Sequence, residues 1–221
     1  MRLQAVVFDV GETLFSEERA WNAWADWLGV RRGVFYAALG ALIAERRDHV
    51  EAFDRFGRGR EVEEAARAAA GIPAHEALFE PYPDAAASLA RVREAGLRVG
   101  VAGNQPVAVE AMLEPLRQPG EVVATSEGWG VSKPAPGFFT RLVGAMGLPP
   151  EAIAYVGDRV DNDIVPAASA GMVAVHVRQG PWGVVQAEWP EAAQAIIRAE
   201  NLTEAADALL VGGRQTGSRP R

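Results

Sequence analysis

The stretch that decides the fold stands near the start of the chain and reads Val6-Val7-Phe8-Asp9-Val10-Gly11-Glu12-Thr13-Leu14-Phe15. An apolar run leads to the carboxylate of Asp9, and the chain then turns at Gly11. Such a run is typical of a buried parallel strand that presents a polar group at its carboxyl end, where open α/β sheets place their ligands. By itself Asp9 fits two interpretations, a reactive carboxylate or an ordinary turn or N-cap aspartate.

Outside this stretch, short apolar runs alternate with helix-like stretches. The apolar runs are 3–8, 97–102, 121–125, 152–156 and 173–177, and the helix-like stretches are 84–95, 106–116, 136–146 and 162–170. This alternation predicts an α/β fold with a three-layer, doubly wound parallel sheet of Rossmann type and helices on both faces.

Residues 16–81 break the alternation, because they contain several helix patterns and no convincing strand. We expect an α/β core built from residues 1–15 and 82–211, with 16–81 inserted as an all-helical domain. Trp21, Trp24 and Trp27 in this insertion fit either its own core or an aromatic wall facing a ligand. Residues 212–221 are glycine-rich, polar and basic, and we predict that they are disordered.

Composition and charge narrow the classes of function. The 221 residues include 29 acidic and 22 basic side chains, for a net charge of −7, which disfavours nucleic acid and anionic membranes as partners. The absence of cysteine excludes disulfides, thiol catalysis and thiolate metal sites. No segment resembles a signal peptide or a membrane span, so the expected location is cytoplasmic. Nothing in the sequence indicates the oligomeric state.

Three later motifs each follow a predicted strand. Gly103-Asn104 ends the second apolar run, Lys133 stands in Ser132-Lys133-Pro134 after the third, and Gly157-Asp158 begins a motif after the fourth that continues to Asp163. A lysine beside a nucleophilic carboxylate lowers the pKa of that carboxylate and screens the charge of a phosphate. The two aspartates offer the hard oxygen ligands that Mg²⁺ prefers, although a solvated acidic turn is the plainer alternative.

Together these motifs resemble those of the haloacid dehalogenase-like (HAD) phosphohydrolase superfamily. Asp9, Thr13 and Leu14 match its nucleophile loop, and the order of the later motifs also matches, so that the resemblance covers nearly all of residues 1–210. It implies that the helical insertion, residues 16–81, is a cap domain over the active site.

The resemblance also implies roles for individual residues. Asp9 would be the nucleophile that accepts a phosphoryl group as an aspartyl phosphate, with Lys133 and Asn104 as further catalytic residues. The implied Mg²⁺ ligands are Asp9, the backbone carbonyl of Gly11, Asp158 and Asp163. Asp161 competes with Asp163 for the last position.

Two residues depart from the family pattern. Gly11 stands where most members have a second aspartate, which protonates the leaving group, and Gly103 stands where most have a serine or threonine. We therefore expect a Mg²⁺-dependent phosphohydrolase of a small phosphorylated metabolite, in which Glu12 replaces the missing acid or a good leaving group makes it unnecessary. One alternative is a catalytically degenerate HAD-fold binding or interaction protein. A 2-haloacid dehalogenase is less favoured, because those enzymes do not use Mg²⁺.

Overall fold

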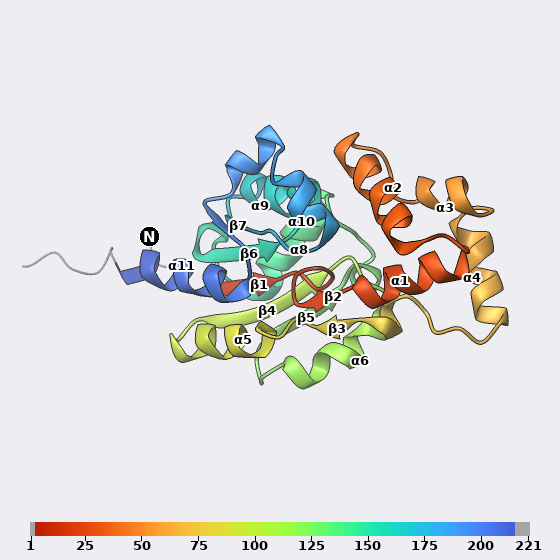
Figure 1. Cartoon of the computed structure of the whole chain (residues 1–221). Helices are drawn as coiled ribbons and strands as arrows, with labels where there is room; N and C mark the ends of the chain where they lie inside the picture. The colour runs from red at the N-terminus through yellow and green to blue at the C-terminus, as the bar shows by residue number, and fades with distance from the viewer. Residues whose placement is uncertain (1–2, 215–221) are drawn as a thin grey trace, which may run out of the picture.

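The computed structural model describes residues 3–214, and within them the chain forms a six-stranded parallel sheet with helices on both faces (Figure 1). The strand order is β5-β4-β1-β6-β7-β8. The strands are β1 (Ala5–Phe8), β4 (Arg98–Gly103), β5 (Val122–Thr125), β6 (Ile153–Gly157), β7 (Val173–Val177) and β8 (Ile197–Ala199). The predicted α/β fold is therefore confirmed.

The central strand β1 sets both the core and the site. Its side chains alternate between the two faces: Val6 and Phe8 belong to one apolar cluster, and Ala5 and Val7 to the other. The first cluster is covered by α5 (Ala85–Glu94), α6 (Glu110–Leu113) and α11 (Leu202–Arg214), and the second by α8 (Pro136–Met146) and α9 (Val165–Ser169). Because β1 pairs with both β4 and β6, the winding reverses at this strand, and the loops that follow these three strands meet at one edge of the sheet.

The helices of residues 85–214 differ greatly in length. They are α5 (Ala85–Glu94), α6 (Glu110–Leu113), α7 (Ser126–Trp129), α8 (Pro136–Met146), α9 (Val165–Ser169), α10 (Gly180–Gln186) and α11 (Leu202–Arg214). Tighter or wider helical turns are η1 (Glu76–Leu78), η2 (Val107–Val109), η3 (Glu114–Leu116), η4 (Pro150–Ala152), η5 (Val160–Ile164) and η6 (Pro190–Gln194).

Four α-helices lie between β2 (Phe15–Ser16) and β3 (Glu80–Pro81) in the sequence and gather to one side of the sheet (Figure 1). They are α1 (Glu18–Trp27), α2 (Arg32–Ala44), α3 (Glu51–Phe56) and α4 (Arg60–Ala69), and we call them the helical segment. Their apolar faces form a third cluster around Trp24, Phe35 and Phe53, which Trp182 of α10 joins from the other part of the chain. The chain enters and leaves through a two-residue antiparallel pairing of β2 (Phe15–Ser16) with β3 (Glu80–Pro81).

Some expected boundaries differ in the structure. Residues 16 and 80–81, assigned to the helical insertion, are extended and belong to β2 and β3. The stretch 106–116 is three short turns rather than one helix, and β8 was not expected. Helix α11 runs to Arg214, so residues 212–214 of the predicted disordered tail are helical, while 215–221 lie outside the described residues.

Among the described residues, no single helix is long and apolar enough to cross a membrane, and α1 and α2 meet that test only as a pair bent by 112°.

The packing of the helical segment gives a first prediction. Trp24 is 1% exposed, and its ring meets Phe53 edge-on at 4.7 Å between centroids and carries the Arg67 guanidinium at 3.9 Å. We expect Trp24→Ala to destabilise the protein by about 3–5 kcal/mol, because it removes a large buried side chain and leaves a cavity. Urea unfolding checks this value. A loss below about 1 kcal/mol would mean that the helical segment does not depend on this cluster.

Candidate active site

Asp9 lies at the carboxyl end of β1, at the reversal point of the sheet. Its backbone N–H donates to Val156 O at 2.9 Å, which continues the β1–β6 pairing up to the functional side chain. The loop then closes tightly, because Leu14 N and Phe15 N both donate to Val10 O at 2.9 Å. Asp9 is 6% exposed. The sheet therefore delivers a nearly buried carboxylate at a fixed position.

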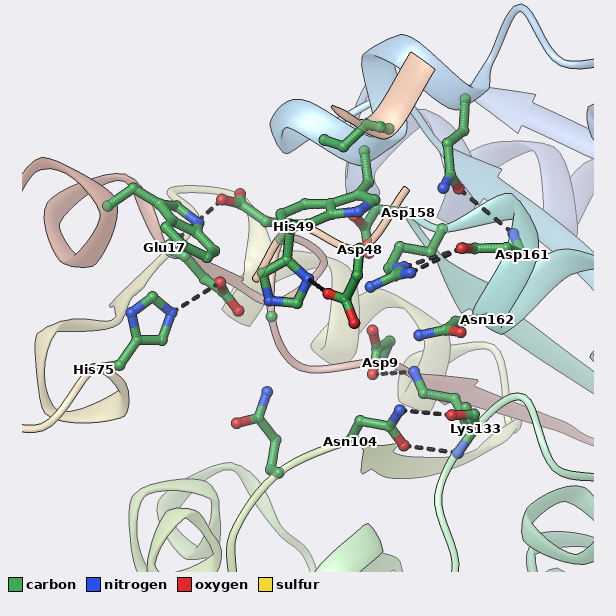
Figure 2. Close-up of a pocket in the computed structure, with 18 of the residues that line it drawn as sticks. Asp9, Glu17, Asp48, His49, His75, Asn104, Lys133, Asp158, Asp161 and Asn162 are labelled. Carbon is green, nitrogen blue, oxygen red and sulfur yellow. Dashed lines mark hydrogen bonds and ion pairs between the residues drawn. The ribbon is translucent and has the colours of Figure 1, made fainter. Parts of the chain in front are cut away.

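A cavity of about 680 Å³ opens over this edge of the sheet, and Asp9 lines it (Figure 2). Residues of the helical segment and residues that follow the parallel strands both line it, so the cavity lies between the sheet and the helical segment. Its polar lining includes Asp9, Glu12, Glu17, Arg46, Arg47, Asp48, His49, His75, Asn104, Gln105, Lys133, Asp158, Arg159, Asp161 and Asn162. Trp21 lines the cavity and also packs in the core of the helical segment, whereas Trp24 packs only in that core.

Lys133 is the only lysine in the chain, and it lies in the middle of the site. Its Nζ lies 2.6 Å from Asp9 Oδ1 and 2.6 Å from Asp163 Oδ1. Asn104 holds the lysine backbone, because its Oδ1 accepts from Lys133 N at 2.7 Å and its Nδ2 donates to Lys133 O at 2.9 Å (Figure 2). The main contacts of Asn104 in the site therefore position Lys133.

Three carboxylates meet beside this lysine. Asp9, Asp158 and Asp163 are all buried, and each offers an oxygen within 4.8 Å of the others. Asp163 Oδ2 also accepts from Arg159 N at 2.9 Å, and a Cβ placed on Gly157 would overlap its carboxylate. The glycine before Asp158 therefore makes room for Asp163 to turn back under the loop.

The charges of this cluster are not balanced within the protein. Burial raises the pKa of Asp9 to about 6, even though Lys133 opposes the rise. Burial, together with the charges of Asp163 and Asp9, also raises the pKa of Asp158 well above its usual range. Burial opposes the charge on Lys133, but attraction to Asp163 and Asp9 outweighs it and raises the lysine pKa. Three carboxylates around one ammonium group leave a need for further positive charge.

Asp161 lies outside the cluster of three carboxylates. Its two carboxylate oxygens accept from the Arg159 guanidinium at 3.0 and 2.8 Å. The same guanidinium lies 5.2 Å from the ring of Trp182. Residues 178–183 lead into α10, and Trp182 of that helix packs in the core of the helical segment.

Glu12 belongs to the nucleophile loop and lines the cavity. It has a φ of 50°, and its carboxylate accepts from Tyr82 Oη at 2.6 Å and from Glu17 N at 3.3 Å. Burial raises the pKa of Glu12 to about 7. Gly103 ends β4 against the nucleophile, and a Cβ placed there would overlap Asp9 Oδ1. A side chain with a hydroxyl at position 103 would therefore require Asp9 to move.

Several residues of the cavity were not singled out as site residues from the sequence. Glu17 and His75 come from the entrance and the exit of the helical segment, and Gln105 follows Asn104. No motif connects Glu17 with His75, which are 58 positions apart. The available signal was the rarity of histidine, of which the chain has three.

Comparison with known proteins places this geometry in a family. The model of the haloacid dehalogenase-like hydrolases matches residues 3–171. The chain is 34% identical over 202 residues to a glyceraldehyde 3-phosphate phosphatase of Methanopyrus kandleri, covering 81% of this chain and 86% of the relative. It is 32% identical over 201 residues to a phosphoserine phosphatase of Thermus thermophilus, covering 82% and 76%.

Solved structures agree on the fold. A HAD family hydrolase from Deinococcus radiodurans, solved with bound phosphate and sodium, has a TM-score of 0.69 at 18% identity and covers 96% of this chain and 97% of its own. An L-2-haloacid dehalogenase has a TM-score of 0.66, also at 18% identity, and covers 95% and 99%. The chain belongs to the haloacid dehalogenase-like hydrolases, and its curated relatives make it a phosphatase-type member of that superfamily.

Proposed function

We propose that this protein is a Mg²⁺-dependent phosphohydrolase that acts on a small phosphorylated metabolite through an aspartyl phosphate on Asp9. The observation that carries the proposal is the buried cluster of Asp9, Asp158 and Asp163 around the Lys133 ammonium group. The activities for which the relatives from Methanopyrus kandleri and Thermus thermophilus are named support a small phosphorylated substrate.

The donor set fits Mg²⁺. The three carboxylates are hard oxygen ligands. Burial raises the pKa values of Asp9 and Asp158, and the charges of the neighbouring carboxylates add to the rise. Asp9, Asp158 and the Gly11 carbonyl would hold the ion, with Asp163 as a further direct or water-mediated ligand. Bound there, Mg²⁺ supplies positive charge that keeps the carboxylates ionised and attracts a phosphate group.

Separate residues of the chain carry out the steps of the proposed reaction. The Asp9 carboxylate attacks phosphorus, and the bond between phosphorus and the leaving oxygen breaks. Lys133 keeps the Asp9 carboxylate in place and offsets the charge of the phosphoryl group, while Asn104 holds Lys133. Water then hydrolyses the aspartyl phosphate and regenerates Asp9. We assign the helical segment the role of a cap, because it supplies the far wall of the cavity.

A phosphate-release assay over a panel of phosphate esters, with and without Mg²⁺, tests this function. The panel includes glyceraldehyde 3-phosphate, O-phosphoserine and p-nitrophenyl phosphate. We expect chelator-sensitive release from at least one of them. Absence of release from every ester would favour the second candidate, binding without turnover, which the missing hydroxyl at Gly103 favours. Carbon–halogen cleavage is disfavoured by the three-carboxylate cluster.

Metal binding also gives a prediction that does not depend on activity. Mg²⁺ at 100 times its dissociation constant should stabilise the protein by about 2.7 kcal/mol, because it binds the folded cluster and not the unfolded chain. A thermal-shift titration measures this effect. Asp158→Asn should remove most of the shift, whereas Asp161→Asn, outside the cluster, should retain it. Equal shifts in both variants would contradict the ligand set.

A further inference from the structure

The space beside Gly11 is filled by a carboxylate from another part of the chain. A Cβ placed on Gly11 would overlap Glu17 Oε1 and lie 3.2 Å from Glu17 Cδ. It would also lie 3.4 Å from Gln105 Nε2. Gly11 and Glu17 line the same cavity as Asp9. The Glu17 carboxylate thus stands where a side chain at position 11 would begin.

His75 holds this carboxylate from the exit of the helical segment. The distance from His75 Nε2 to Glu17 Oε2 is 3.1 Å, and the two side chains are 9% and 14% exposed (Figure 2). The His75 ring packs against Trp21 at 4.7 Å and Phe79 at 5.4 Å between centroids, which limits its rotation. Glu17 therefore has a defined direction and is not a freely moving surface side chain.

Glu12 supports Glu17 from the other side. The Glu12 carboxylate accepts from the backbone N–H of Glu17, and its other oxygen accepts from the Tyr82 hydroxyl at 2.6 Å. It also lies close against Gly180, where a Cβ would come within 2.6 Å of its carboxylate atoms. These contacts hold both carboxylate oxygens of Glu12, whereas His75 holds one oxygen of Glu17 and the other, Oε1, lies against Gly11.

We propose that Glu17, positioned by His75, is the general acid and base of this active site, which rests on the proposed phosphohydrolase function. When Asp9 attacks phosphorus, the bond to the leaving oxygen breaks and the Glu17 carboxyl group gives its proton to that oxygen, which leaves as an alcohol. The Glu17 carboxylate then takes a proton from the water that attacks phosphorus. The bond between phosphorus and Asp9 breaks, inorganic phosphate leaves, and Glu17 is protonated for the next cycle.

Leaving groups of different basicity test the proposal. An alkyl phosphate needs a proton on its leaving oxygen, and p-nitrophenyl phosphate scarcely does. We expect Glu17→Gln to lower kcat/KM by about 10²–10⁴ on whichever of glyceraldehyde 3-phosphate and O-phosphoserine the wild type hydrolyses faster, and by less than about tenfold on p-nitrophenyl phosphate. His75→Asn should show the same split with a smaller loss.

Glu76→Gln is the matched control, because Glu76 is another carboxyl group of the cavity wall beside His75. It should leave the ratio of the two substrates unchanged. Equal losses on both substrates in Glu17→Gln, or no loss on the alkyl ester, would overturn the role of Glu17 while leaving the phosphohydrolase intact. Failure of the wild type on every ester would overturn the proposed function, and this inference with it.

Moving the carboxyl group from position 17 to position 11 gives a second test. Gly11 lies outside the left-handed region, so its backbone accepts an aspartate once Glu17 is shortened. The double variant Gly11→Asp/Glu17→Ala should recover at least about tenfold of the alkyl-ester activity lost in Glu17→Ala. Hydrolysis of p-nitrophenyl phosphate shows that both variants are folded. A double variant that keeps this activity but gains nothing on the alkyl ester counts against the proposal.

Discussion

Asp9→Asn is expected to lower phosphate release by at least about 10⁴-fold, because an amide cannot form the bond to phosphorus that the proposed mechanism requires. The substitution preserves shape and removes a negative charge from a cluster in which burial already raises the pKa of Asp9 to about 6. We therefore expect a folded protein. Release from p-nitrophenyl phosphate with Mg²⁺ measures the loss, and urea unfolding measures stability.

The control for this variant is Asp48→Asn, because Asp48 also lines the cavity but its carboxylate faces His49, 3.2 Å away, and not Lys133. Its activity should stay close to that of the wild type. Reaction with BeF₃⁻, a phosphate mimic, separates the two candidate functions further. Modification of the wild type without phosphate release would indicate a competent nucleophile in a binding protein. Substantial turnover by Asp9→Asn would contradict nucleophilic catalysis by this residue.

The main strands could be read from the sequence because each is a buried apolar run that ends in a polar turn. The run at 3–8 became β1, and the runs at 97–102, 121–125, 152–156 and 173–177 became β4–β7. Strand β8 was not predicted, because it has only three residues and the exposed Arg198 interrupts its apolar pattern. The stretch 106–116 carries helical spacing, but Pro115 lies in its last turn, and the structure breaks it into three short pieces.

The residues expected at the site from motifs do converge, for a topological reason. Asp9, Gly103 and Asp158 end or follow three neighbouring parallel strands, so their loops meet without further information. The contact of Glu17 with Gly11 and His75 could not be predicted in this way. It depends on how the entrance and exit of the helical segment fold back over the nucleophile loop, and local patterns do not encode that packing.

Apart from Lys133, the basic side chains counted in the sequence are all arginines, so the choice of lysine at this position is informative. Lys133 is buried between Asp9 and Asp163, with its Nζ 5.4 Å from the ring centroid of Tyr155. A compact ammonium group fits between two carboxylates, whereas a planar guanidinium needs more width. Tyr155 itself is fixed, because its hydroxyl donates to Ala102 O at 2.8 Å. Tyr155 therefore limits the space around the Lys133 ammonium group, and we expect an arginine in Lys133→Arg to fit poorly despite its charge.

Lys133→Met is expected to be the most destabilising substitution in the site, with a loss of about 3–5 kcal/mol near neutral pH without Mg²⁺, because it leaves buried carboxylates without their cation. Urea unfolding in the presence of a chelator measures the loss. The pKa of Asp9 is already raised to about 6 in the wild type, so its folded form binds protons more readily than the unfolded chain. The free-energy contribution of such a group is most favourable at low pH and is lost as the pH rises.

Removal of Lys133 raises these carboxyl pKa values further, so the difference in stability between wild type and Lys133→Met should widen as the pH rises through about 6 and narrow as the pH falls below it. Arg141→Met is the matched control, since Arg141 is an exposed cation on α8 and should change stability little at any pH. Mg²⁺ should recover part of the stability lost in Lys133→Met, because a divalent ion balances the same carboxylates. A pH-independent difference that Mg²⁺ leaves unchanged would mean that Lys133 supports the fold by packing and not by charge.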